Sequence, residues 1–213
     1  MKKHLTLIIL CVILLAFAGC AKQYTALETA ELPSSLQTET YNGVTASFSA
    51  DDWTFDTSLD IFQLYYVPSL ENEKVDNINI VLAGAYPGKI DESFLKTFLK
   101  EMDTQYRASG ISIDRSEIMS FNGENIIYME CSTTITDELI DTLIEQGSIT
   151  EDMIDSMGGR DVLKASGNNT QLMLHAVIDG NIATVTGSYV GEQNKNAILD
   201  GMKVLLQTAE VSA

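Results

Sequence analysis

The sequence predicts an α+β fold, in which a mainly antiparallel sheet of six or seven strands is flanked by helices. Turn sequences at Phe121-Asn122-Gly123 and Asp179-Gly180-Asn181 each separate two strand-like runs, and tight turns join strands that pair antiparallel. Two other segments, from Asp91 to Gly110 and over residues 192–208, carry apolar residues at helical spacing. Because these helices lie far apart in the chain, we expect both to cover the sheet.

The first part of the predicted domain consists of strands followed by a helix. Residues 44–48 alternate as a strand, and two further β-rich runs, 61–67 and 78–86, stop at proline residues. Asp91 then provides a cap for the first helix. The apolar stripe of that helix is formed by Phe94, Leu95, Phe98, Leu99 and Met102.

The second part of the domain alternates hairpins and helices. Residues 137–157 carry two apolar helical stripes that are broken at Gly147, and we expect an exit loop at Gly158-Gly159 and residues 166–169. The stretch 137–165 is strongly acidic and has the character of an insertion. The expected strands are 111–120, 124–135, 171–178 and 182–189, and the closing helix spans about 192–208.

The amino terminus has the layout of an export signal. Lys2 and Lys3 precede an almost wholly apolar run over residues 5–17, which is shorter than a membrane-spanning helix requires. The run Phe17-Ala18-Gly19-Cys20 resembles the lipobox of bacterial lipoproteins, although Leu is usual where Phe17 stands. This resemblance implies cleavage after residue 19 and diacylglyceration of Cys20. Ordinary secretory cleavage before Gly19 and a retained membrane anchor are the alternatives.

These features divide the chain into three parts. Residues 1–19 are predicted to be a lipoprotein signal peptide, and residues 20–42 a lipidated, flexible tether rich in Thr, Glu, Ser and Gln. Residues 43–210 then form a single globular domain. We expect an extracytoplasmic protein that is anchored to a bacterial membrane, with the lipid bilayer as its partner through acylated Cys20.

The net charge and the number of cysteines restrict the classes of partner and the disulfide bonds that the chain can have. The whole chain has a net charge of −17, which argues against nucleic acid as a partner because phosphate binding depends on cationic side chains. Without residues 1–19, which contain two lysines and no acids, the formal charge becomes −19. Because anionic lipids repel such an acidic surface, the acyl chains must provide the attachment to the membrane. Cys131 then remains as a lone thiol and has no disulfide partner in the chain.

One stretch of the predicted domain suggests a family. Residues 41–48 followed by Asp51-Asp52-Trp53 are similar to the opening of PsbP-like domains, and the order of the later helices and hairpins also matches over about residues 41–208. The chain departs from the pattern in lacking a proline before Trp53 and in the insertion at 137–165. The resemblance implies an α/β/α sandwich, and a binding or assembly role rather than catalysis.

No constellation of catalytic residues stands out in the sequence. His175 is the only histidine after the signal segment, which is too few for a histidine-based metal cluster, and we expect no cofactor. A dyad of Cys131 with His175, or of His175 with a nearby serine, would make the chain a secreted hydrolase. We expect instead a small buried thiol and a sheet or core histidine, and therefore no enzyme.

Two sets of side chains are candidates for binding. Asp137, Asp141 and Glu145 lie four residues apart on one helix face, where they could attract Ca²⁺ or a cationic partner, although a solvated face is the simpler interpretation. The aromatic residues near strand ends could line a ligand groove or plug the core; they are Trp53, Tyr65, Tyr66 and Tyr86. We therefore expect a non-catalytic binding or accessory protein with an envelope protein as a partner, the alternatives being a small-ligand or Ca²⁺ binder and the hydrolase.

Overall fold

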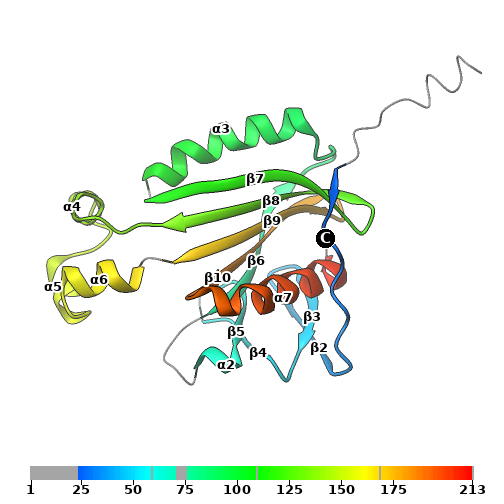
Figure 1. Cartoon of the computed structure of the whole chain (residues 1–213), viewed down its shortest axis with the longest axis horizontal. Helices are drawn as coiled ribbons and strands as arrows, with labels where there is room; N and C mark the ends of the chain where they lie inside the picture. Colours follow the sequence, from blue (N-terminus) through cyan, green and yellow to red (C-terminus); the bar gives the residue numbers. More distant parts are fainter. Residues whose placement is uncertain (1–23, 59, 71–75, 109, 168, 213) are drawn as a thin grey trace, which may run out of the picture.

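The computed structural model describes residues 24–58, 60–70, 76–108, 110–167 and 169–212. Within them an eight-stranded sheet has the order β1-β7-β8-β9-β10-β6-β5-β4, and a three-stranded sheet has the order β11-β3-β2. All paired strands are antiparallel except β1 with β7. The predicted α+β class, with a mainly antiparallel sheet flanked by helices, is confirmed (Figure 1). The large sheet has eight strands instead of the six or seven expected, and the predicted strand 44–48 lies in the small sheet.

The bounds of the elements follow the predicted ranges closely in the centre of the chain. The strands of the large sheet are β1 (Thr25–Ala26), β4 (Trp53–Asp56), β5 (Phe62–Tyr66), β6 (Asn77–Ala85), β7 (Ile111–Phe121), β8 (Glu124–Thr133), β9 (Thr170–Ile178) and β10 (Asn181–Tyr189). The small sheet contains β2 (Leu36–Tyr41), β3 (Val44–Ser49) and β11 (Glu210–Val211). The helices are α2 (Val67–Leu70), α3 (Glu92–Ala108), α4 (Asp137–Glu145), α5 (Glu151–Ser156), α6 (Arg160–Gly167) and α7 (Lys195–Thr208), which follows a 3₁₀ turn (Glu192–Asn194).

The two faces of the large sheet carry separate cores. Helix α3 covers one face (Figure 1), where its Phe94 and Phe98 pack against Ile127 and Met129 of β8. The other face is covered by α7 and the small sheet, which contribute Met202 and Phe48 among others to the larger core. The period of the strands explains this division, because successive side chains point to opposite faces of a sheet.

The amino-terminal segment corrects the predicted boundary between tether and domain. Residues 20–23 lie outside the described residues, but from Thr25 onward the chain belongs to the fold. Strand β1 pairs with β7, and β2 pairs with β3 over residues 36–41. Residues of β2 are mostly exposed, so the strand lacks the apolar alternation that marks a half-buried strand. Backbone pairing with β3, together with side-chain hydrogen bonds of Thr38 to Ser47 and of Thr40 to Thr45, holds this part of the predicted tether to the domain.

The acidic insertion forms a projecting lobe at one end of the large sheet, beyond β8 and β9 (Figure 1). The predicted break at Gly147 lies between α4 and α5, as expected. Helix α6 (Arg160–Gly167) was not predicted, and the expected exit loop is wrong at residues 166 and 167, which end this helix. Helices α4 to α6, residues 137–167, together form the acidic lobe.

Candidate functional site

Trp53 occupies the first position of β4, where its indole packs against side chains from other elements of the fold. It is opposite Tyr66 of β5 in the strand register, so the two rings lie on the same face, with their centroids 5.1 Å apart. The Trp53 side chain is 6% exposed. The indole therefore forms the floor of a site and is not a freely accessible ring.

Gly201 lets helix α7 approach the indole of Trp53. A Cβ atom at residue 201 would lie 2.5 Å from the indole Cζ2 and 2.7 Å from Ile78 Cδ1, closer than any side chain tolerates. Glycine in a helix interior costs about 1 kcal/mol relative to alanine, and here it allows this close packing. A second glycine, Gly187 on β10, fits under Ile198 and Met202 of α7 in the same way.

Beside Trp53, a groove of about 470 Å³ runs between α7, the turn from β3 to β4, and residues 28–33. The amino-terminal segment forms one wall, which is fixed by hydrogen bonds. The backbone N–H of Ala30 donates to Gln207 Oε1 at 2.9 Å, and Gln207 Nε2 donates to the Ala30 carbonyl at 3.2 Å. The Leu27 N–H donates to the carbonyl of Ser120. These bonds give the wall a defined position although it lacks regular secondary structure.

The groove is strongly acidic. Four carboxylates line it, from Glu28, Glu31, Asp52 and Asp200, whereas Lys203 is the one cation among the lining residues that the structure describes. Lys203 Nζ lies 3.0 Å from Asp200 Oδ1 and so offsets a single acid. Burial raises the pKa of Tyr66, and the nearby charges of Asp52 and Asp76 raise it further, because a phenolate beside carboxylates is unfavourable. Aromatic rings and uncompensated negative charge therefore meet in one groove.

The structure brings together only part of the predicted aromatic set. Trp53 and Tyr66 share the groove, but Tyr65 is the next residue along β5 and therefore points to the other face of the sheet. Tyr86 lies on the α3 side, where its ring centroid is 4.8 Å from that of Phe94. The four aromatic side chains do not form one site.

His175 and Cys131 do not form a dyad. Both lie on the sheet face that α3 covers, but His175 pairs with Ile127 of β8 while Cys131 pairs with Gln171 of β9. The four-residue offset separates them by roughly 13 Å at the usual rise of a strand. His175 Nδ1 lies 2.9 Å from Thr184 Oγ1, and its ring has an edge contact with Phe98 at 4.6 Å. Both side chains are at most 1% exposed, and both are on the opposite face from the groove.

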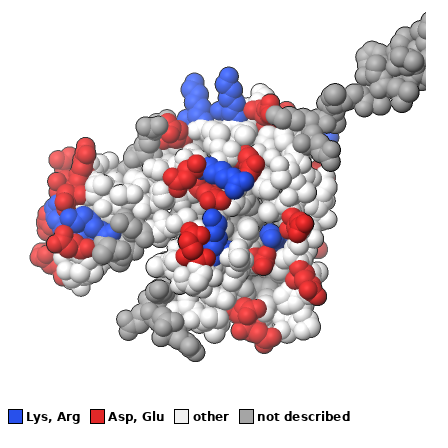
Figure 2. Space-filling view, viewed as in Figure 1, with Lys and Arg blue, Asp and Glu red and all other residues white. Residues whose placement is uncertain are grey.

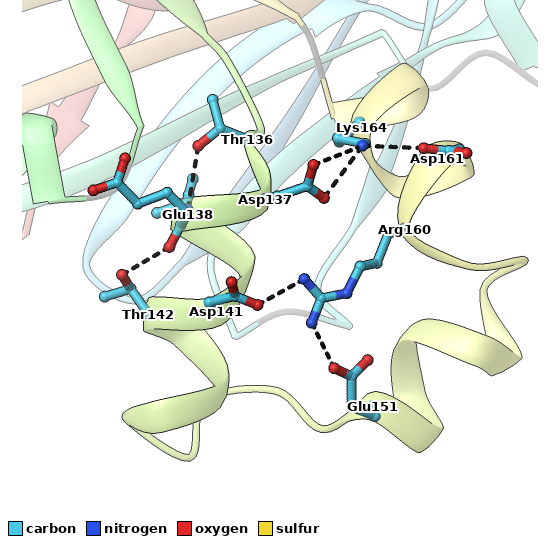
Figure 3. Close-up of polar contacts among 10 residues, drawn as sticks. Thr136, Asp137, Glu138, Asp141, Thr142, Glu151, Arg160, Asp161 and Lys164 are labelled. Carbon is cyan, nitrogen blue, oxygen red and sulfur yellow. Dashed lines mark hydrogen bonds and ion pairs between the residues drawn. The ribbon is translucent and has the colours of Figure 1, made fainter.

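The acidic lobe contains its own counter-ions. Arg160 of α6 donates to Asp141 at 2.6 Å and to Glu151 at 2.5 Å, and Lys164 donates to Asp137 at 3.1 Å (Figure 3). In the part of the chain that the structure describes, no group of three metal-ligating side chains gathers. The predicted stripe of Asp137, Asp141 and Glu145 is therefore partly neutralised by Arg160 and Lys164 of α6, a helix that was not predicted.

Several lining residues of the groove were not predicted. Glu28 and Glu31 belong to the expected tether, and Asp200 and Lys203 belong to the outward face of the closing helix, where charged residues are normal. The one available signal was Gly201 inside an otherwise amphipathic helix, since an isolated glycine there often has a packing reason. The acids of the amino-terminal wall give no comparable local signal.

Taken together, the fold and the groove define a class: an α+β domain with an antiparallel sheet, helices on both faces, and an acidic aromatic groove beside the last helix. None of the helices in the described ranges is long and apolar enough to cross a membrane. The predicted lipid attachment site, Cys20, lies outside those ranges.

Comparisons with known proteins give the following picture. No protein-family model matches the chain, and neither does any curated protein sequence. Among solved structures, the chain is similar to cyanobacterial PsbP (CyanoP) from Synechocystis sp. PCC 6803, with 10% identity, a TM-score of 0.46, and coverage of 85% of this chain and 95% of that one. It is also similar to LpqN, involved in cell envelope biogenesis of Mycobacterium tuberculosis, with 11% identity, a TM-score of 0.43 and coverage of 84% and 92%. At such values neither likeness says what this chain binds.

Proposed function

We propose that this protein is a lipid-anchored, extracytoplasmic, non-catalytic binding protein, and that its groove beside Trp53 holds a cationic group of the ligand. The main observation in support of this ligand site is that two aromatic rings lie in a groove with four carboxylates and only one lysine among its lining residues. A cation near an aromatic face gains about 0.5 to 2 kcal/mol, and carboxylates attract it further. An amine or guanidinium on an apolar stem fits both features.

The proposed anchor is Cys20, which the sequence run Phe17-Ala18-Gly19-Cys20 supports. Acylation would place the domain at the membrane surface as an accessory subunit, where a basic side chain of an envelope protein is the expected occupant of the groove. Palmitate labelling of the full-length protein in cells tests this step. We expect label and membrane sedimentation for the unaltered chain, and neither for Cys20→Ala. Equal sedimentation of both would refute the anchor.

The groove is tested through the fluorescence of Trp53, which is the only tryptophan in the chain. Titration with spermidine at constant ionic strength should change the emission, while succinate should not. The double variant Asp52→Asn with Asp200→Asn should weaken spermidine binding by more than tenfold, because two of the four carboxylates are gone. As a matched control, the double variant Asp152→Asn with Asp155→Asn removes two exposed carboxylates from the acidic lobe, away from the groove. Equal weakening by the control would show nonspecific attraction and refute the site.

A further inference from the structure

The distance between the proposed anchor and the fold is short. The first described residue, Tyr24, is four residues after Cys20, so a fully extended chain between them spans at most about 14 Å. Tyr24 packs in the core under α3, and Thr25 pairs with Met119 near the end of β7. Because the fold begins this close to Cys20, an acyl chain on Cys20 would hold one end of the large sheet near the membrane.

That end of the sheet carries the β7–β8 turn and the beginning of α3. Asn125, which follows the turn, donates its side-chain N–H to the Ile90 carbonyl at 2.8 Å, so the helix starts beside the turn. The acidic lobe is at the other end (Figure 1). From Met119 back to Ile111, where β7 begins, the strand is about 27 Å long at the usual rise per residue. The lobe therefore begins farther from the entry of the chain than the anchor can reach.

Charge favours one orientation of this long axis. The lobe residues 137–167 contain eight carboxylates against Arg160 and Lys164, a net formal charge of −6, and they form a mixed but mainly red region in Figure 2. Anionic lipids repel such a surface within a Debye length of about 8 Å. If the long axis of the domain lay parallel to the membrane, the lobe would come within that distance of the lipids. If the axis stands perpendicular to the membrane, the lobe lies beyond it.

We propose that the bilayer surface contacts the end of the domain that carries the β7–β8 turn and the start of α3, and that the acidic lobe projects away from the membrane. The proposal rests on the acylation of Cys20 proposed above. The lobe then faces soluble partners away from the membrane, and the turn end faces the lipid headgroups.

The test uses the full-length acylated protein in vesicles of phosphatidylcholine with a minority of phosphatidylglycerol. A fluorophore is attached to Ser93→Cys at the start of α3, to Lys100→Cys two turns later, or to Gln146→Cys in the lobe; all three positions are exposed. The native Cys131 does not compete for the label because it is fully buried. Headgroup nitroxide lipids then quench the fluorophore at short range.

We expect quenching in the order Ser93, Lys100, Gln146, several-fold stronger at the first site than at the last. Equal quenching at Ser93 and Lys100 would mean that α3 lies flat, and quenching at Gln146 as strong as at Ser93 would mean that the lobe touches the bilayer; either result overturns the orientation. As a control, a flexible insertion of about 20 Gly and Ser residues after residue 22 adds roughly 25 Å of average span and should weaken the quenching at Ser93. If the protein does not sediment with the vesicles, or if Cys20→Ala does, the anchor itself fails and the orientation falls with it.

Discussion

Protonation of His175 should destabilise the fold as the pH falls below 6.5. Burial lowers the pKa of His175 from 6.5 to about 4, since a charged imidazolium would lose its hydration under α3. The imidazole contacts Phe98 and Thr184, and its Nε2 is buried without a partner among the described residues. In the unfolded chain the same imidazole binds a proton at its ordinary pKa.

The sign and size of the effect follow from linkage. Between pH 6.5 and 4 the unfolded state binds one more proton than the native state, so the free energy of unfolding falls as the pH falls. The loss starts near pH 6.5 and is complete below about pH 4. A difference of about 2.5 pKa units corresponds to about 3 kcal/mol at 1.36 kcal/mol per unit.

Urea unfolding of the unaltered protein and of His175→Leu, at intervals between pH 7 and 4, measures this contribution. Other titrations cancel in the difference between the two proteins. Two more titratable groups of the same core are Tyr106 and Cys131, and burial raises their pKa to about 12 and about 11, outside the window. The difference in stability between the proteins should change by up to 3 kcal/mol, in favour of the variant at low pH. Parallel curves would refute a buried, neutral His175. If His175→Leu does not fold, His175→Gln provides the same comparison.

Three further predictions concern packing and charge. Gly201→Ala should lower the free energy of unfolding by about 1–2 kcal/mol, because overpacking against the Trp53 indole exceeds the helix-propensity gain. Urea unfolding measures this loss, and Asn196→Ala at an exposed position of the same helix serves as a nearly neutral control. Equal stability of the two variants would count against the close contact. Asp76→Asn should cost about 2 kcal/mol, since the carboxylate is fully buried and accepts hydrogen bonds from the Val190 N–H and the Asn194 side chain. Urea denaturation measures this loss, and an unchanged midpoint would refute it. Arg160→Gln should leave the melting temperature nearly unchanged without Ca²⁺. Millimolar Ca²⁺ should raise the melting temperature of the variant, because two lobe carboxylates have lost their counter-ion. Scanning calorimetry of the unaltered protein and the variant, each with Ca²⁺ and with EDTA, measures this, and the absence of a Ca²⁺-dependent rise in the variant would contradict it.

The elements that were predicted well are those with a strong internal period. Helix α3 begins after Asp91, whose carboxylate accepts the Phe94 N–H at 2.8 Å, and both hairpin turns place Asn or Asp residues at positive φ, as at Asn122 and Asp179. These features depend on neighbouring residues, so they are legible in the sequence. Strand β2 was missed because most of its residues are exposed, and helix α6 because it is short, follows two glycines and ends in a third.

The groove was predictable only at its floor. Trp53 and Tyr66 were candidates as aromatic residues near strand ends, and Asp52 precedes Trp53 directly. The other acids of the groove come from residues 28–31 and from Asp200, which are some 170 positions apart. What brings them together is the contact between Ala30 and Gln207. A polar side chain that binds a backbone segment so distant in sequence has no periodic signature.

The same contact makes the amino-terminal segment part of both proposed functions, because residues 28–33 wall the groove and also lead to Cys20. A chain beginning at Gly43, the predicted domain boundary, would lack β1, β2 and this wall. We expect it to lose stability, since β3 would become an open edge opposite β11 and β7 would lose its pairing with β1. We also expect it to lose spermidine binding even where it folds, because Glu28 and Glu31 are gone. A chain beginning at Tyr24 keeps every described element, so it should retain full groove affinity while being unable to hold the membrane. Equal affinity of the two chains would show that the wall does not contribute to the site, and would separate ligand binding from attachment.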